Sequence, residues 1–333
     1  MTRKAPRPPH GAPFPAAKKK REKMEIKNEK ASIFTKPYVL IFSALLCCAL
    51  WGSASPAIKI GYQLLSVSGV PSTILFAGVR FFMAGVITVL IYSLARRKFL
   101  FPKKENLPRV LTVSAFQTVI QYIFFYIGLA NTTSVKGTIA SGSSAFFCVL
   151  IASLVFKQEK LTLKKILACV LGFAGIIVVN LSGLTLTMNF LGDGFVILST
   201  VSYAFSSVLM KRFSKHEDPV VISGYQFIAG GAFMIILGLS LGGEISLSDG
   251  RGIALLIYLA FLSAIAYALW GLLLKFNPVS RVSIFSFTTP IFGTILSILL
   301  LPGTSGTSPI NIAITLVLVS AGIFLLNYSG KKR

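Results

Sequence analysis

Ten long apolar runs constrain this chain more than any other feature of its sequence. Each holds about the 20 residues that an α-helix needs to cross roughly 30 Å of hydrocarbon. Backbone amides in lipid must hydrogen-bond within their own segment, and the runs lack the alternation of a barrel strand. We therefore expect ten transmembrane helices, with approximate limits 38–60, 71–95, 108–129, 134–156, 164–182, 192–212, 219–241, 252–274, 279–301 and 308–328.

The composition supports a membrane protein and excludes an ordinary soluble domain. Hydrophobic residues make up 54% of the chain and charged residues 13%, and the mean hydropathy is +0.77. Soluble domains carry about a quarter charged residues. The net charge of +23 would favour nucleic-acid binding in a soluble chain. Because basic residues in short loops between apolar runs are what orient a membrane protein, we expect no nucleic-acid partner.

Basic residues occupy alternate loops, and this pattern predicts the orientation of the chain. They cluster at 96–109, 157–165, 211–215, 275–281 and 331–333. The loops near 63–70, 183–191 and 302–307 contain no Lys or Arg, and Arg251 in the loop 242–251 is offset by Glu244 and Asp249. Since basic loops stay on the cytoplasmic side, we expect both termini in the cytoplasm and a multi-pass protein of the cell membrane.

The chain also repeats itself. At a constant offset of 145 residues, Tyr122 falls on Tyr267, Lys136 on Arg281, Ser143-Ser144 on Thr288-Thr289 and Phe147 on Phe292. Ten helices in two copies leave five per copy, and an odd number inverts the second copy in the membrane. The predicted fold is therefore an all-α membrane protein of two inverted five-helix repeats, 37–182 and 192–328.

Residues 1–36 precede the first apolar run and are rich in Lys, Arg and Pro. Such a segment cannot bury enough apolar surface to fold, so we predict a disordered cytoplasmic tail. It would anchor the topology, although binding to anionic lipid is an alternative. The sequence from Met24 onward resembles the beginning of an ordinary protein chain. It is therefore open whether residues 1–23 belong to the native protein.

Short motifs in fixed order relate the chain to a known family. They include Ala49-Leu50-Trp51-Gly52 with Pro56, then Arg80-Phe81, Glu159-Lys160-Leu161, Tyr203-Ala204 and Thr289-Pro290-Ile291. In their order and spacing over about residues 38–328, the sequence resembles the drug/metabolite transporter superfamily, in its EamA-type branch. The resemblance implies a secondary transporter that exports or takes up small polar metabolites, often amino acids or related compounds.

One position departs from the family pattern. Members usually repeat the acidic turn before the last helix, but residues 301–306 read Leu-Pro-Gly-Thr-Ser-Gly. The second-half counterpart of Glu159 is therefore absent. Glu159 itself falls in a basic turn, where the sequence favours a structural role.

Arg80 is the most informative charge within the runs. It lies about ten residues past Pro71, or roughly 15 Å, which is near the middle of the hydrocarbon. A cation there costs at least ~3 kcal/mol, so it should face the bundle interior or water. The spans hold no Asp or Glu in their interior to pair with it. Two roles stay open: a structural arginine bonded to carbonyls, hydroxyls or rings, and a contact for a substrate carboxylate.

Polar and aromatic side chains within the spans are candidates for a cavity lining at the repeat interface. Hydroxyls that knit helices together and aromatic rings at the membrane surface are the alternative explanation for many of them. Pro56 and Pro290 fall within spans and are candidate hinges, since each removes a backbone hydrogen bond. The other candidates, besides Arg80, are Trp51, Gln117, Gln121, Tyr122, Ser144, Tyr203, Gln226, Tyr267, Trp270 and Thr289.

The sequence favours transport by alternating access over other functions. No titratable acid or histidine lies in a span interior, so facilitated diffusion or exchange is the simplest mechanism, and coupling through Asp193 or Glu159 is the alternative. An intramembrane enzyme is disfavoured because His10 and His216 both lie outside the spans. We expect no metal and no cofactor, a monomer or weak homo-oligomer, and the bilayer and a small polar metabolite as partners. A membrane scaffold or sensor is the rival function.

Overall fold

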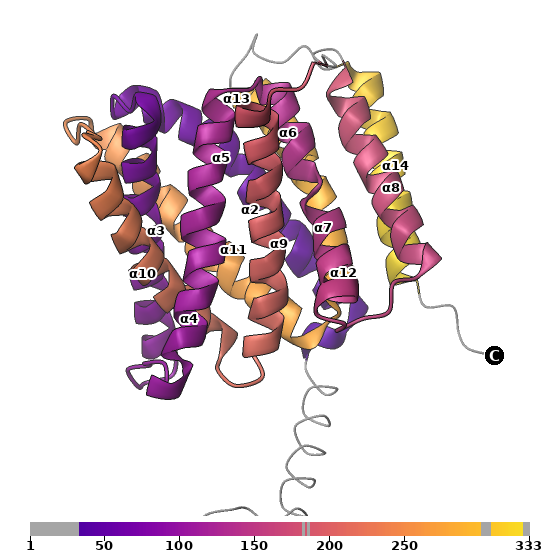
Figure 1. The fold of residues 1–333 in the computed structure, drawn as a ribbon, viewed down its shortest axis with the longest axis horizontal. Coiled ribbons are helices and arrows are strands. Elements are labelled where there is room, and N and C mark those ends of the chain that lie inside the picture. Colours follow the sequence, from indigo (N-terminus) through magenta and orange to yellow (C-terminus); the bar gives the residue numbers. More distant parts are fainter. Residues whose placement is uncertain (1–32, 182–183, 185–186, 301–307, 329–333) are drawn as a thin grey trace, which may run out of the picture.

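The computed structural model describes residues 33–181, 184, 187–300 and 308–328. Within these ranges the chain forms helices joined by turns and bends, and no strand (Figure 1). Residues 1–32 of the expected tail lie outside the described residues. The described chain therefore begins at the short helix η1, Ile33–Thr35, and the all-helical fold class is confirmed.

The elements divide between the two expected repeats. The first holds α2 (Pro37–Leu64), α3 (Gly69–Ala95), η2 (Lys104–Asn106), α4 (Leu107–Ser114), η3 (Ala115–Ile120), α5 (Gln121–Ala130), α6 (Ser134–Gly142), α7 (Ser144–Leu150), η4 (Ile151–Val155) and α8 (Leu163–Val179). The second holds η6 (Phe190–Gly194), α9 (Phe195–Phe213), α10 (Pro219–Ser240), α11 (Gly250–Phe276), α12 (Val279–Ser283), η7 (Ile284–Thr288), α13 (Thr289–Leu300) and α14 (Pro309–Asn327).

Nine helical segments of the described residues are long and apolar enough to cross a membrane. The remaining expected span, 164–182, is α8, whose 17 residues extend about 26 Å. It ends early because Asn180 closes it: the Asn180 side-chain amide donates to the carbonyl of Ile176 at 2.9 Å. A span of this length is at the lower limit for crossing hydrocarbon, so the count of ten stays a prediction.

Helix packing follows the symmetry of an inverted repeat. Counterpart helices pack on each other, α3 on α10 and α8 on α14. The cross-contacts also come in matched pairs: α2 packs on α11 and α13, and its counterpart α9 packs on α5 and α7. If each helix is replaced by its counterpart in the other repeat, the same pairs of helices are in contact. Helix α6, which carries Lys136, lies at one end of the bundle, and α12, which carries Arg281, lies at the other (Figure 1).

We call the end that carries the loops 96–106, 156–162 and 214–218 the basic end, at the bottom of Figure 1, and the other the opposite end. The fourth and ninth spans are interrupted at matching places. Ser143 separates α6 from α7, and η7 separates α12 from α13. Pro290 is the second residue of α13, where its missing amide hydrogen costs nothing. Pro56 lies inside the continuous helix α2.

Glycines let α3 and α10 approach closely, and this approach positions the arginine of α3. A Cβ on Gly85 would lie 2.6 Å from the carbonyl oxygen of Gly224, and one on Gly231 would lie 2.4 Å from the backbone nitrogen of Phe82. Neither position tolerates a side chain without a shift of the helices. The backbone contact therefore sets the rotation of α3 about its axis and holds Arg80 inside the bundle.

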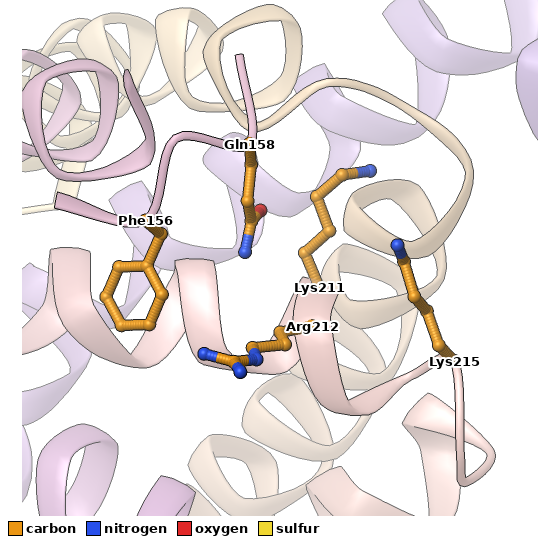
Figure 2. Close-up of a pocket in the computed structure, with 5 residues that line it drawn as sticks. All are labelled: Phe156, Gln158, Lys211, Arg212 and Lys215. Atoms are coloured by element: carbon orange, nitrogen blue, oxygen red, sulfur yellow. The ribbon is translucent and has the colours of Figure 1, made fainter. Parts of the chain in front are cut away.

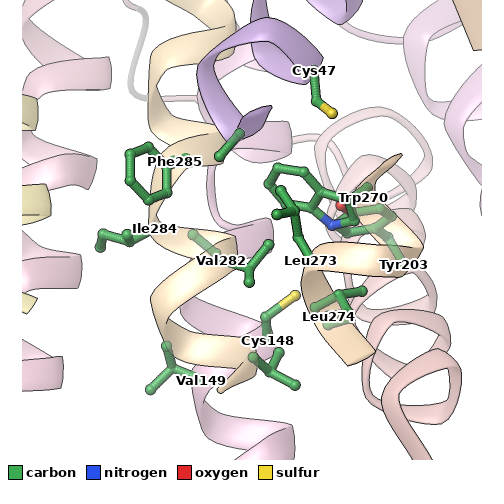
Figure 3. Close-up of a cluster of buried hydrophobic side chains, with 14 of the residues drawn as sticks. Cys47, Cys148, Val149, Tyr203, Trp270, Leu273, Leu274, Val282, Ile284 and Phe285 are labelled. Atoms are coloured by element: carbon green, nitrogen blue, oxygen red, sulfur yellow. The ribbon is translucent and has the colours of Figure 1, made fainter. Parts of the chain in front are cut away.

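A buried cluster of apolar side chains joins the two repeats (Figure 3). It includes Cys148 and Val149 from the first repeat and Trp270, Leu273 and Phe285 from the second. Cys47, Cys48, Cys148 and Cys169 are all buried and form no disulfide.

Candidate functional site: a buried arginine and aromatic centre

The guanidinium of Arg80 is buried, with 3% of the residue exposed. Its Nε and Nη2 both donate to the hydroxyl of Ser263, at 3.1 and 3.0 Å, and that hydroxyl donates to the carbonyl of Leu259. The guanidinium also lies 4.9 Å from the centre of the Phe81 ring. Arg80 forms no ion pair with any carboxylate of the described residues. A charge in this position is desolvated without an opposite charge to offset it.

Aromatic rings from both repeats meet beside this arginine. Trp51 of α2 packs edge-on against Tyr267 and Trp270 of α11, with ring centres 5.2 and 4.9 Å apart. The hydroxyls of Tyr122 and Tyr267, which are counterparts in the repeat, lie 3.0 Å apart. The Tyr122 ring lies 4.5 Å from Phe81, the residue after Arg80. The interface between the repeats is therefore aromatic at the level of Arg80.

Several buried hydrogen-bond donors of this region have no acceptor. The indole nitrogens of Trp51 and Trp270 and the side-chain nitrogen of Gln226 are buried and have no partner among the described residues. The oxygen of the Gln226 amide is already used, because it accepts from the Thr118 hydroxyl at 2.7 Å. A buried polar group without a partner costs about 1–3 kcal/mol. The two free indole N–H groups and the guanidinium suit a ligand that brings oxygen acceptors.

The remaining candidate residues for the cavity lining have fewer contacts with the arginine and aromatic centre. Gln117, Gln121 and Thr289 each have a buried side-chain oxygen without a partner, and Ser144 begins α7 half-buried. No hydrogen bond or ring contact of the described residues joins these four to the aromatic rings. Tyr203, 9% exposed, lies close to Trp270 (Figure 3). Their part in a cavity lining stays a prediction.

Sequence reasoning missed Ser263, which is the hydroxyl that holds Arg80. A signal for it was present, because Ser263, Tyr267 and Trp270 are spaced by four and three residues. This spacing places all three on one face of a helix. The face is the one that α11 turns toward the centre, since Tyr267 and Trp270 contact Trp51.

At the basic end, a carboxylate of the first repeat holds the second. Glu159 accepts hydrogen bonds from the backbone nitrogen of Ser280 at 3.1 Å and from its hydroxyl, at the start of α12. The ammonium of Lys165 lies 2.7 Å from the same carboxylate. Burial alone would raise the pKa of Glu159, but the hydrogen bonds from Lys165 and Ser280 and the Lys165 charge outweigh it and lower this pKa. Glu159 is therefore ionised at neutral pH.

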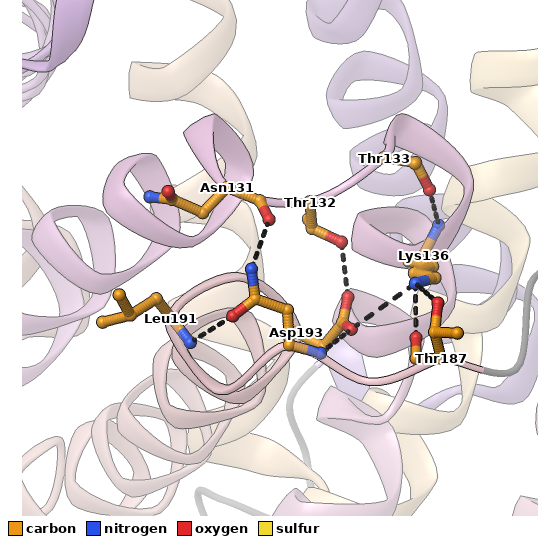
Figure 4. A network of polar contacts seen from close by, with 8 residues as sticks. Asn131, Thr132, Thr133, Lys136, Thr187, Leu191 and Asp193 are labelled. Carbon is orange, nitrogen blue, oxygen red and sulfur yellow. Dashed lines mark hydrogen bonds and ion pairs between the residues drawn. The ribbon is translucent and has the colours of Figure 1, made fainter.

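At the opposite end, a carboxylate of the second repeat holds the first (Figure 4). Asp193 accepts from the Thr132 hydroxyl and from the backbone nitrogen of Asn189, the latter at 2.9 Å. Lys136 lies 3.9 Å from Asp193, and its ammonium also donates to the carbonyl and hydroxyl of Thr187. Each end of the bundle thus has a carboxylate, Glu159 or Asp193, whose hydrogen bonds cross between the repeats; at the basic end Glu217 also crosses, since it accepts from Asn106.

Comparison with known proteins matches this architecture. The model of the EamA-like transporter family matches twice, at residues 39–181 and 190–328. An "Uncharacterized transporter" of Archaeoglobus fulgidus is 25% identical over 77% of this chain and 88% of its own length. The "WAT1-related protein At3g02690, chloroplastic" of Arabidopsis thaliana is 25% identical over 84% of this chain and 67% of its own length.

Further matches support the same fold. The "Uncharacterized transporter sll0355" of Synechocystis is 27% identical over 84% of this chain and 86% of its own length. One solved crystal structure superposes with a TM-score of 0.72 at 18% identity, and the match covers 88% of this chain and 96% of that one. At that identity the superposition shows a shared fold and nothing more.

Proposed function

Since the chain belongs to the EamA-like transporter family, we propose that it carries small polar metabolites that bear a carboxylate, such as amino acids, across the cell membrane. Family membership makes the protein a membrane transporter of the drug/metabolite type, and not an enzyme. The observation that carries the substrate proposal is the buried charge of Arg80, which forms no ion pair with a carboxylate of the described residues.

The chemistry of the centre favours a carboxylate over other polar groups. A guanidinium binds a carboxylate through two parallel hydrogen bonds, and such charge-assisted bonds are about twice as strong as neutral ones. The free nitrogens of Trp51, Trp270 and Gln226 add donors and no acceptors. The rings of Trp51, Tyr122 and Tyr267 would contact the uncharged part of the same molecule. An amino acid with an apolar or aromatic side chain combines these features.

The two carboxylate bridges support a mechanism of alternating access. Breaking the bond between Glu159 and Ser280 would open the basic end, and breaking the contacts of Asp193 with Thr132 and Lys136 would open the opposite end. One bridge stays closed while the other opens. Pro56 in α2 and Pro290 after η7 are the proposed hinges, because backbone hydrogen bonding is interrupted at both.

The same proposal sets the topology and the driving force. Ten helices in two inverted repeats, with both termini in the cytoplasm, place the basic end at the cytoplasmic surface. The substrate gradient would drive transport by facilitated diffusion or exchange, since the interiors of the expected spans contain no Asp, Glu or His that could carry a proton.

Counterflow in proteoliposomes tests the substrate class. Purified full-length protein is reconstituted with one labelled amino acid inside, and unlabelled amino acids, the matching decarboxylated amines and sugars are offered outside, with and without a pH gradient. We expect exchange with compounds that carry a carboxylate and none with the amines. Equal exchange with the amines would contradict the proposed role of Arg80.

Substitution of the arginine tests the site. We expect Arg80→Gln to lower the initial rate more than tenfold at unchanged abundance, because at least ~1.5 kcal/mol of charge-assisted bonding is lost. Lys59→Gln is the matched control, since Lys59 is a cation of the neighbouring helix α2 that is exposed. A parallel loss of abundance and rate in Arg80→Gln would make Arg80 a structural residue.

A further inference from the structure

A pocket of about 320 Å³ lies at the basic end, away from the arginine and aromatic centre (Figure 2). Both repeats build it. The turn after η4 supplies Phe156 and Gln158, and the end of α9 with the loop beyond supplies Lys211, Arg212 and Lys215. Three of the five lining side chains are cationic and none is acidic. The pocket therefore concentrates positive charge where a span meets the membrane surface.

Lys211 of the pocket donates to the carbonyls of Leu274 and Asn277, and the other two cations lie apart from acids. Arg212 and Lys215 form no ion pair with a carboxylate of the described residues. The two glutamates nearest in sequence are engaged elsewhere. Glu159 is held by Ser280 and Lys165, and Glu217 accepts from the side chain of Asn106 and the backbone nitrogen of Lys103. An anion that enters the pocket meets cations without a competing carboxylate.

The first repeat shapes the pocket and adds a free acceptor. Lys157 adopts a left-handed backbone conformation, with φ of 50°, and the turn closes when the Gln158 nitrogen donates to the carbonyl of Ala152 at 2.8 Å. The Gln158 side chain then reaches α9, where its Nε2 donates to the carbonyl of Val208 at 3.2 Å. Its Oε1 is buried and has no partner among the described residues. This oxygen can accept from a hydroxyl of a bound molecule.

Apolar surface leads directly from the pocket onto the side of the bundle. Leu154 and Val155, the two residues before Phe156, are 57% and 59% exposed. They end the fourth span, so this surface faces lipid. The guanidinium of Arg212 lies 6.0 Å from the centre of the Phe156 ring, which joins the apolar surface to the basic one. A free phosphate would use only the basic part, whereas a phospholipid would use both.

We propose that this pocket binds the headgroup of an anionic phospholipid. The phosphodiester lies between Arg212 and Lys215, a headgroup hydroxyl donates to Gln158 Oε1, and the acyl chains run along Leu154 and Val155. Basic recesses between helices on the cytoplasmic side suit such headgroups. Because the headgroup touches both repeats, its binding stabilises the form in which the basic end is closed.

Thermal unfolding of the full-length protein in neutral detergent tests this site. The probes are dioleoylphosphatidylglycerol, the zwitterionic dioleoylphosphatidylcholine, the hydroxyl-free dioleoylphosphatidylmethanol, and glycerol 3-phosphate. A ligand that binds only the folded state raises the unfolding temperature, and at equal concentration a tighter ligand raises it more. We expect phosphatidylglycerol to raise it most and phosphatidylcholine least. Stabilisation by glycerol 3-phosphate equal to that by phosphatidylglycerol would show a free-phosphate site and overturn the lipid proposal.

Charge substitutions separate a built site from general attraction. One cation near an anionic surface contributes roughly a factor of five in affinity, so Arg212→Gln/Lys215→Gln should weaken phosphatidylglycerol binding about 25-fold. Lys98→Gln/Lys104→Gln is the control, because it removes two exposed cations from the same end outside the pocket. Equal weakening by both pairs, or none by the pocket pair, would overturn the proposal.

The hydroxyl contact has a test of its own. Gln158→Leu should abolish the preference for phosphatidylglycerol over phosphatidylmethanol while it leaves the charge of the pocket unchanged. A preference that survives this substitution would contradict the contact with Gln158. These measurements report binding without transport, so their outcome is independent of the substrate proposed for the centre.

Discussion

The two ends of the bundle are closed by the same chemistry arranged in different ways. At the basic end the ion pair lies within the first repeat, since Glu159 and Lys165 both belong to it, and the bonds that cross to the second repeat come from Ser280. At the opposite end the ion pair itself crosses, from Asp193 to Lys136. At the basic end, Lys165 orients the Glu159 carboxylate within the first repeat. At the opposite end, Lys136 of the first repeat attracts the Asp193 carboxylate of the second.

This difference ranks the two closures. At the basic end two hydrogen bonds cross from Ser280 to Glu159, whereas at the opposite end one crosses from Thr132 to Asp193 and the Lys136 ammonium lies 3.9 Å away. Hydrogen bonds to a charged group stabilise by about 1.5–3 kcal/mol, and the attraction between charges weakens with distance. The basic end is therefore the tighter closure, and the transporter should rest with that end shut.

The largest effect is expected from Glu159→Gln. The amide loses the charge that Ser280 binds, so the equilibrium should shift about tenfold toward an open basic end, or roughly 1.5 kcal/mol. The rate at which a membrane-impermeant maleimide labels Val279→Cys measures the shift, because Val279 is fully buried at the start of α12. Glu105→Gln removes an exposed carboxylate from the same end and should leave the rate unchanged. A rate unaffected by Glu159→Gln would show that Glu159 does not close this end.

A smaller effect in the other direction is expected from Asp193→Asn. The looser ion pair predicts about a fivefold shift toward an open opposite end, or roughly 1 kcal/mol. Labelling of Val196→Cys reports it, since Val196 is fully buried beside Gly128 of α5. Asp249→Asn is the control, because Asp249 lies in a loop of the same end and pairs with the exposed Arg251. A shift larger than that of Glu159→Gln would reverse the ranking of the two closures.

The smallest effect is expected from pH. The folded-state pKa of Glu159 is lowered, so its stabilisation is complete above the ordinary value for Glu, roughly 4.3, and is lost only as pH falls through the lower folded value. Labelling of Val279→Cys should therefore be constant between pH 5 and 8, after correction for the reactivity of the thiol. A rise toward pH 5 that Glu159→Gln removes would show that this carboxyl titrates in that range, and would make it a candidate for proton coupling.

Much of the fold follows from the sequence because lipid leaves the backbone few choices. The apolar runs predicted the helices, and the offset of 145 residues identified Tyr122 and Tyr267 as counterparts, which the structure places with their hydroxyls 3.0 Å apart. The repeat also predicted that Lys136 and Arg281 lie at opposite ends. The backbone of an apolar run in lipid has to form a helix to satisfy its amides. The sequence therefore has to show mainly where each helix begins and ends.

The site was harder to predict, because it depends on how helices turn about their axes. Arg80 was found from its charge alone, but Ser263 was not, since a serine in an apolar run has many neutral roles. Glu159 was expected to be structural, and its bond to Ser280 spans 121 residues that no local pattern connects. The approximate limit of 182 lies beyond the end of α8 at Val179, because Leu181 extends the apolar run past Asn180.

The central claim is that the two ends open in alternation about one buried centre, and labelling of both ends in one variant tests it most directly. The four native cysteines are buried, so single cysteines at 279 and 196 report the two ends. In Glu159→Gln, the account predicts faster labelling at position 279 and slower labelling at position 196. Labelling that rises at both positions, or changes at position 279 alone, would contradict alternating access.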